Sequence, residues 1–331
     1  MLNRLYIVVG ILAILAIGAA FIVPRLIPWG NYRDRMEALA TEALGTHVAI
    51  NGDIRFSLLP QPHLSLMDVA VGPGQTPVMA VKSVDADFSL MDFLRDRYSM
   101  TRLVLDHPVL ELRVDDHGHL ATGLALPAAV TRANVSVANA SVAGGLVRII
   151  DARSAQTVEI SGVDGELALG AIRGPFAFQG AASLGDDRYS LHLASTALAA
   201  DGTTQVSFFA KPDKGAFSVN ASGILTTGQA PHLVGDLSYR QTPAAAKDAS
   251  SAQGDLTFTS KLDATADKIA LSSYALQPDE NRAATRLTGS AVINLGKSPN
   301  FDASISGGVL ASASTSNSPT PYSGCASNIP R

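Results

Sequence analysis

The residues best suited to chemistry in this 331-residue chain are its seven histidines, and only two of them stand close together. His117 and His119 occur in the run DDHGH, where Asp115 or Asp116 could join the two imidazoles at a metal ion. A catalytic zinc normally has three protein ligands and a supporting shell of hydrogen bonds, and nothing near this run supplies them. Asp, His and Gly also tolerate turn conformations, so we favour a hairpin turn and predict no metal site.

Other catalytic motifs are incomplete or absent. The Gly-Lys-Ser beginning at Gly296 lacks the first glycine of a phosphate-binding loop, because Ala291 stands at that position. The residues from Phe301 to Ile305 alternate as in a strand, and do not predict the helix that would hold phosphate. No Gly-x-Ser-x-Gly motif occurs, and no carboxylate pair stands out for acid-base chemistry. We therefore predict that the chain is not an enzyme and uses no cofactor.

The composition narrows the classes of partner. The net charge is −4 and no cluster of Lys and Arg occurs, which disfavours nucleic-acid binding. The only cysteine, Cys325, permits neither an intrachain disulfide nor a Cys-based metal site. Charged residues make up only 16% of the chain, so the exposed surface is expected to be polar but weakly charged.

An uncharged apolar segment lies near the N-terminus. From Leu5 to Val23 no charged residue occurs for 19 positions, which as a helix spans the hydrocarbon core of a bilayer. Tyr6 and Trp29 lie near its two ends, as interfacial aromatic residues do. A cleaved signal peptide is the alternative, with a cleavage site at residues 16–18, but apolar sequence continues beyond that site. The length favours a retained transmembrane helix.

A short amphipathic helix is expected directly after this segment. Asn31 can cap its N-terminus, and Gly45 suits the position after its C-terminus. Four apolar residues share one helical face: Tyr32, Met36, Leu39 and Ala43. This face is expected to pack on the residues that follow, and contact with lipid head groups through two nearby arginines is the alternative.

From residue 46 to about residue 306, apolar and polar residues alternate with a period of two. Such alternation is typical of β-strands with one buried face, and turn residues separate the strands. One short helix is expected between Ser89 and Tyr98. The predicted fold class is mainly β (α+β), in which the two N-terminal helices precede a long antiparallel sheet.

A sheet with one apolar face must shield that face, and the sequence offers too few helices to cover it. The sheet can close into a barrel, pack as a sandwich, or curl into an open trough that meets lipid tails. A membrane-spanning barrel is disfavoured, because aromatic residues make up only 6% of the chain. For a curved sheet with an open apolar groove, the expected lining is Ile54, Phe56, Leu58, Leu64, Leu66, Val84, Phe88, Leu110 and Leu112.

Two prolines interrupt the strand pattern between Gly52 and Gly72. The apolar residues keep one parity through Pro60 and Pro62, and the parity slips at Met67, which predicts a bulge or a turn there. Prolines suit an edge strand or a strand corner. We therefore expect a bend at the rim of the sheet nearest the membrane, with His63 as a polar rim residue.

Several of these elements, taken in order, resemble the N-terminal region of the AsmA family. They are the apolar segment, NYRDRMEALATEALG, VAINGDIRFSLLPQPHLSLMDVAVG and MAVKSVDADFSLMDFLRDRYSMTRLVLDHPVLELRVDDHGHL. Later stretches, including VEISGVDGELALGAIRGPFAFQGAASLGDDRYSLHLAS and GSAVINLGKSPNFDASISGGVL, resemble the repetitive middle of that family. The resemblance implies an inner-membrane protein of Gram-negative bacteria with its body in the periplasm, an orientation that the flanking arginines leave open. It also implies a role in outer-membrane biogenesis and, for several members, transfer of phospholipid along an apolar β-groove.

The expected organisation is an anchor over residues 1–28, a family-like helix and β region over 29–122, a repetitive β-groove over 123–310 and a disordered tail over 311–331. The expected partners are membrane phospholipid, the inner membrane and other envelope proteins. A scaffold that assists outer-membrane protein assembly through its sheet edges is the alternative function.

Overall fold

The computed structural model describes residues 27–73, 77–93, 99–119, 136–137, 139–169, 174–228, 230–241, 256–278, 286–296 and 299–307, with the single residues 18 and 95. Apart from Gly18, the predicted transmembrane segment from Leu5 to Val23, with Tyr6, lies outside these residues, as does the predicted tail. Within the described part of the chain, no helix has both the length and the apolar character needed to cross a bilayer.

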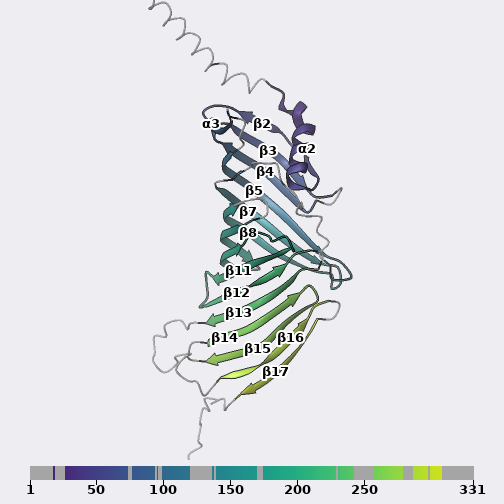
Figure 1. The fold of residues 1–331 in the computed structure, drawn as a ribbon, viewed down its shortest axis with the longest axis vertical. Helices are drawn as coiled ribbons and strands as arrows, with labels where there is room; N and C mark the ends of the chain where they lie inside the picture. The colour runs from purple at the N-terminus through teal and green to yellow at the C-terminus, as the bar shows by residue number, and fades with distance from the viewer. Residues whose placement is uncertain are drawn as a thin grey trace, which may run out of the picture.

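One sheet of 17 strands makes up most of the described chain, and its strands are stacked along the long axis of the molecule (Figure 1). The helices are short: η1 (Trp29–Tyr32), α2 (Arg33–Leu44) and α3 (Leu90–Phe93). The first strands are β1 (Val48–Ile50), β2 (Ile54–Ser57), β3 (His63–Val71), β4 (Met79–Phe88), β5 (Ser99–Val114), β6 (Ser136–Val137), β7 (Ala140–Asp151) and β8 (Gln156–Leu169). They continue as β9 (Phe176–Leu184), β10 (Asp187–Ser195), β11 (Thr203–Pro212), β12 (Phe217–Thr226), β13 (His232–Gln241), β14 (Leu256–Thr265), β15 (Lys268–Pro278), β16 (Leu287–Asn294) and β17 (Asn300–Gly307).

Strands that follow one another in the chain mostly pair with each other. Among the described strands, all pairings are antiparallel except those that β5 makes with β6 and β7. β1 and β2 both pair with β3 at one end of the sheet, and β17 pairs with β16 at the other. β5 pairs in parallel with β6 and β7, so the prediction of an entirely antiparallel sheet is wrong at this point. A parallel pair needs a long connection that returns to the start of the strand. This is why a long small-residue stretch, and not a tight turn, separates β5 from β7 in the sequence.

The two faces of the sheet differ in chemistry, as the alternation predicts. Partner residues form apolar rows across the strands, such as Leu167, Phe178, Leu193 and Phe208 across β8 to β11. A second row across β12 to β17 contains Leu225, Leu233, Ala264, Ile269, Ile293 and Phe301. We call the side that carries these rows the apolar face, and the other side the polar face.

The apolar face continues into the N-terminal strands across a slip in the alternation. Asp68 in β3 has a φ of 52°, which lets Leu66 before it and Val69 after it pack in one cluster. The slip predicted at Met67 is therefore confirmed, one residue later. β5 slips in the same way at His107, with a φ of 47°. These left-handed residues keep apolar side chains on one face where strict alternation would reverse them.

The edge of β1 is covered by side chains of α2. The carboxylate of Glu37 accepts a hydrogen bond from the backbone N–H of Ile50 at 2.6 Å, and the hydroxyl of Thr41 accepts one from Val48 at 3.0 Å. Arg33, one helical turn before Glu37, donates to the carbonyl of Gly52 at 2.8 Å. These side chains of α2 bond backbone groups at the edge of the sheet that could otherwise pair with another strand.

Two details of the helix prediction are wrong. Tyr32 and Leu39, expected on the packed face, are 48% and 59% exposed, because the face of α2 that bonds β1 turns them away from the sheet. Asn31 does not cap the helix, which begins after Tyr32 without a side-chain cap. Gly45 does end it in the left-handed conformation, with a φ of 68°, as predicted. Of the helix expected between Ser89 and Tyr98, the described residues show only the turn of α3.

Strong twist brings distant turns of the sheet together. The guanidinium of Arg153, in the turn after β7, lies 2.6 Å from the carboxylate of Asp267, in the turn after β14, and 2.9 Å from that of Asp151. Seven antiparallel steps separate β7 from β14, so these two turns leave the sheet at opposite edges. Steps of about 20–25° accumulate to about 140–175°, roughly the half turn that this contact requires.

Candidate functional site

The predicted lining residues mostly come together on the apolar face at the N-terminal end of the sheet. Phe56 lies opposite Leu64, and Ile54 lies opposite Leu66, which in turn lies opposite Val84. Leu110 lies opposite Met79. Met79 and Leu66 both pack against one buried cluster, which consists of Val48, Val69, Val71 and Val81. The predicted residues on the two sides of the slip therefore share one face.

Three other predicted positions lie farther from this centre. Leu112 is paired with Ile149 of the parallel strand β7. Phe88 lies at the end of β4, opposite Met100, where the register shifts. Leu58 follows the last residue of β2 and is half-buried, next to the proline-containing turn that joins β2 to β3. The segment with the two prolines is thus a reversal between paired strands at the rim, where a bend was predicted.

Trp29 links the start of the apolar face to the predicted anchor. Its ring lies edge-on to Phe56, with centroids 5.0 Å apart, and 5.7 Å from the ring of Tyr32. Trp29 was predicted at the membrane interface from its place after the apolar segment. Through this contact, an aromatic residue that follows the apolar segment in sequence packs against one of the first apolar side chains of the sheet.

The apolar face carries no charge over its C-terminal half. From β11 to β17, no described position on this face holds Asp, Glu, Lys, Arg or His. The charged residues of these strands, such as Lys211, Asp236 and Lys261, lie on the polar face. An uninterrupted uncharged surface can hold an aliphatic chain at many similar positions, because no position requires a charge to be desolvated.

Paired glycines let neighbouring strands approach closely on the apolar face, a feature that the sequence prediction missed. A Cβ on Gly165 would lie 2.7 Å from the Cα of Gly180, and one on Gly223 would lie 2.7 Å from the Cα of Gly235. The neighbouring backbones therefore approach on this side, and only glycine fits. The ring of Phe178 lies over the first pair, within 2.9 Å of either added Cβ. Glycines inside strand patterns are the sequence signal for such close approach.

The apolar face is left open at its far end. Phe301 and Ile305 of β17 are 75% and 67% exposed, although they continue rows that begin on earlier strands. All residues of β17 are exposed, and β16 is the one described strand that pairs with it.

The histidine run forms a turn, as predicted, but not the predicted hairpin, because β5 pairs in parallel with the next strands, β6 and β7. The backbone N–H groups of His119 and His117 donate to the Asp115 carboxylate at 2.8 and 2.9 Å. These bonds, led by the one from His119, hold the pKa of Asp115 below its ordinary value. No set of three potential metal ligands is grouped anywhere in the described residues. His63, predicted as a rim residue, lies 2.7 Å from the carboxylate of Asp87.

The fold and this face define an elongated, open β-sheet protein with an uncharged apolar surface along one face of its sheet. The model of the AsmA family matches residues 1–272, which is most of the 331-residue chain. The chain therefore belongs to the AsmA family, which is associated with the bacterial envelope and is consistent with a role in outer-membrane biogenesis. No curated protein and no solved structure matches the chain significantly.

Proposed function

We propose that this protein is anchored in the inner membrane, extends into the periplasm and carries phospholipid acyl chains along its apolar face. The observation that carries the proposal is the uncharged apolar surface that runs without interruption from β11 to β17. Each buried CH₂ of an acyl chain contributes about 0.8 kcal/mol, which offsets extraction from the bilayer. Movement along the face then needs binding of similar strength at each strand, and rows of Leu, Ile, Val and Phe supply it.

The N-terminal end supports loading from the membrane. The predicted anchor leads through Trp29 to Phe56, so an acyl chain that leaves the bilayer meets apolar side chains at once. The first rows of the apolar face follow from Phe56 to Leu64 and onward. No nucleophile or metal is needed for this task, because the lipid is moved and not modified.

Photo-crosslinking tests the proposal by comparing neighbouring positions that face opposite ways. A photoreactive residue at Val206, on the apolar face of β11, should capture phospholipid when the full chain is irradiated in native membranes. The same residue at Gln205, on the polar face of the same strand, is the matched control and should capture little. Mass spectrometry identifies the adduct. Equal capture at the two positions, or none at Val206, contradicts the proposal.

A scaffold for outer-membrane protein assembly is the second candidate, and the exposed edge of β17 favours it. The opposite edge, at β1, is hydrogen-bonded by α2, whereas β17 pairs only with β16 among the described strands. An unpaired edge of this kind can add a strand from another protein. Crosslinking from Asp302 should capture a client protein if this function holds, and phospholipid should then be missing at Val206.

A further inference from the structure

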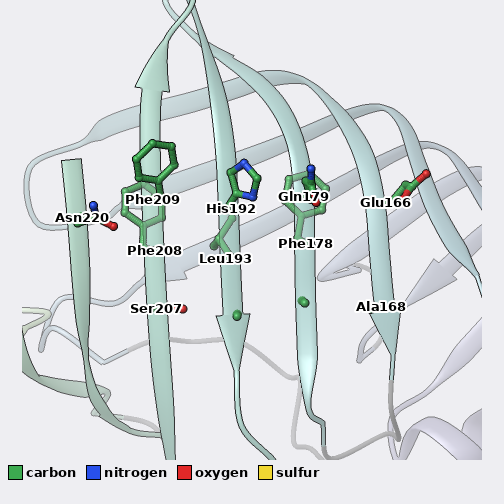
Figure 2. Close-up of a pocket in the computed structure, with 12 residues that line it drawn as sticks. Glu166, Ala168, Phe178, Gln179, His192, Leu193, Ser207, Phe208, Phe209 and Asn220 are labelled. Carbon is green, nitrogen blue, oxygen red and sulfur yellow. The ribbon is translucent and has the colours of Figure 1, made fainter. Parts of the chain in front are cut away.

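The polar face carries a groove that the lipid proposal does not use. Two adjoining hollows of about 340 and 570 Å³ lie over β8 to β13, and both are lined by Ala194 and Ser207. Figure 2 shows the first hollow, with His192 and Phe209 on one side of the sheet and Phe208 on the other. We call the two hollows together the polar-face groove.

A row of small residues beside a row of longer ones creates this groove. Ala177, Ala194 and Ser207 are successive partners across β9 to β11, and they form its floor. Gln179, His192, Phe209 and Asn220 are successive partners in the next parallel row, and they form one wall. Ile224 and Val234, paired with each other and about half exposed, stand on the other side of the floor. The groove thus runs across the strands, and an extended ligand can lie along it.

The lining excludes the ligands that the rest of the protein suggests. No Lys or Arg lines either hollow, and the carboxylates of Glu166 and Asp236 line the first and the second hollow, so the groove repels a phosphate or an anionic head group. The strands beneath it are paired on both sides, so their backbone groups are not available to a peptide that adds as a strand. A ligand must therefore be recognised by side chains alone, and without negative charge.

The chemistry of the walls matches an uncharged, polyhydroxylated chain, and we propose that the polar-face groove binds an oligosaccharide. Phe209 lies edge-on to His192, with ring centroids 5.7 Å apart, and the two rings offer apolar surface to the C–H groups of a sugar. Gln179 and Asn220 stand on the two sides of these rings, and each amide can both donate and accept hydrogen bonds. Two adjacent rings flanked by amide groups suit the C–H faces and the hydroxyl groups of a sugar chain.

Binding of chitohexaose, an uncharged hexasaccharide, to the full-length protein in detergent tests this proposal by saturation-transfer NMR and calorimetry. Phe209→Ala should weaken binding about tenfold through the lost ring contact. Gln179→Ala, at an exposed position that does not support the fold, should weaken it about threefold. Phe208→Ala is the matched control. Phe208 also lines the first hollow, but its side chain lies on the apolar face, on the other side of the sheet from Phe209 (Figure 2). This variant should leave sugar binding unchanged and reduce co-purified phospholipid.

The two readouts separate this proposal from the lipid proposal. Chitohexaose binding that is lost in Phe209→Ala and Gln179→Ala but kept in Phe208→Ala supports the oligosaccharide site, whatever the lipid content. Absence of chitohexaose binding at millimolar concentration, equal binding by all three variants, or preference for an anionic oligogalacturonate overturns it. If none of the variants loses co-purified lipid, this result counts against the lipid proposal but not against the oligosaccharide site.

Discussion

The glycine pair at Gly223 and Gly235 should be essential for the close approach of β12 and β13, and replacing one glycine tests this. A Cβ at Gly235 would lie 2.0 Å from the carbonyl oxygen of Ser222 and 2.5 Å from the Cα of Gly223. Ordinary carbon contacts are about 3.5–4.0 Å, so β12 and β13 must separate by about 1 Å or more at this point. Both obstacles are backbone atoms, so no change of rotamer relieves them.

The cost of Gly235→Ala follows from that displacement. Separating two strands by about 1 Å stretches the neighbouring hydrogen bonds of the ladder beyond useful length, at about 0.5–1.5 kcal/mol each. Two such bonds amount to about 1–3 kcal/mol, which agrees with the usual cost of overpacking a well-packed site. We therefore expect a loss of about 1–3 kcal/mol in the free energy of unfolding.

Urea unfolding of the full-length protein, followed by circular dichroism at strand wavelengths, measures this loss. Gly30→Ala is the control, because a Cβ at Gly30 meets no atom within 4 Å. Its midpoint should stay within experimental error of the wild-type value. If Gly235→Ala also unfolds at the wild-type urea concentration, then β12 and β13 do not approach as closely as described, and the argument that only glycine fits at this pair fails.

The remaining predictions concern the edge at α2 and the turn contact of Arg153. The double variant Glu37→Ala, Thr41→Ala should expose the edge of β1 and produce oligomers in light scattering, while a monomeric variant would show that α2 does not protect this edge. Arg153→Gln should lengthen the spin-label distance between the turns that hold Asp151 and Asp267, and an unchanged distance would show that the contact does not hold them together. Hydrogen bonds from Arg153 lower the pKa of Asp151, so this bond stabilises the protein above about pH 4 and the stabilisation is lost as the pH falls through the lowered pKa. The wild type should therefore lose more stability than Arg153→Gln between pH 5 and pH 2 in urea titrations, and parallel losses would contradict this assignment.

Much of the strand structure could be predicted because the alternation of apolar and polar residues depends only on neighbouring positions in the sequence. Alternation at Phe176 and Phe178, or at Phe217 and Val219, reports only that one face of a strand meets a different environment from the other. The slip after Met67 was visible for the same reason, since it changes parity over a few residues. The turn at Asp115 was also local, because Asp accepts hydrogen bonds from the backbone just beyond it.

The candidate site was predicted only where neighbouring strands are close in sequence. Phe56, Leu64 and Val84 belong to consecutive strands, so their common face followed from parity. The parallel pairing of β5 with β7 was missed, because alternation has the same form in parallel and antiparallel strands. The α2 contacts were misassigned because the helix presents a polar stripe to a strand edge, and a search for an apolar face points to Tyr32 and Leu39 instead.

The sequence by itself determined that this protein is a long run of one-faced strands behind an uncharged segment, with weak charge and no catalytic motif. These properties depend on residue type and on spacing within a few positions. Only the tertiary structure decided how the strands follow one another in space. The contact of Arg153 with Asp267 depends on twist accumulated over seven strand steps, and the polar-face groove depends on the register that aligns Gln179, His192 and Phe209. Register and twist arise from pairing between residues that are distant in the sequence. The alternation along a single strand therefore predicts neither of them.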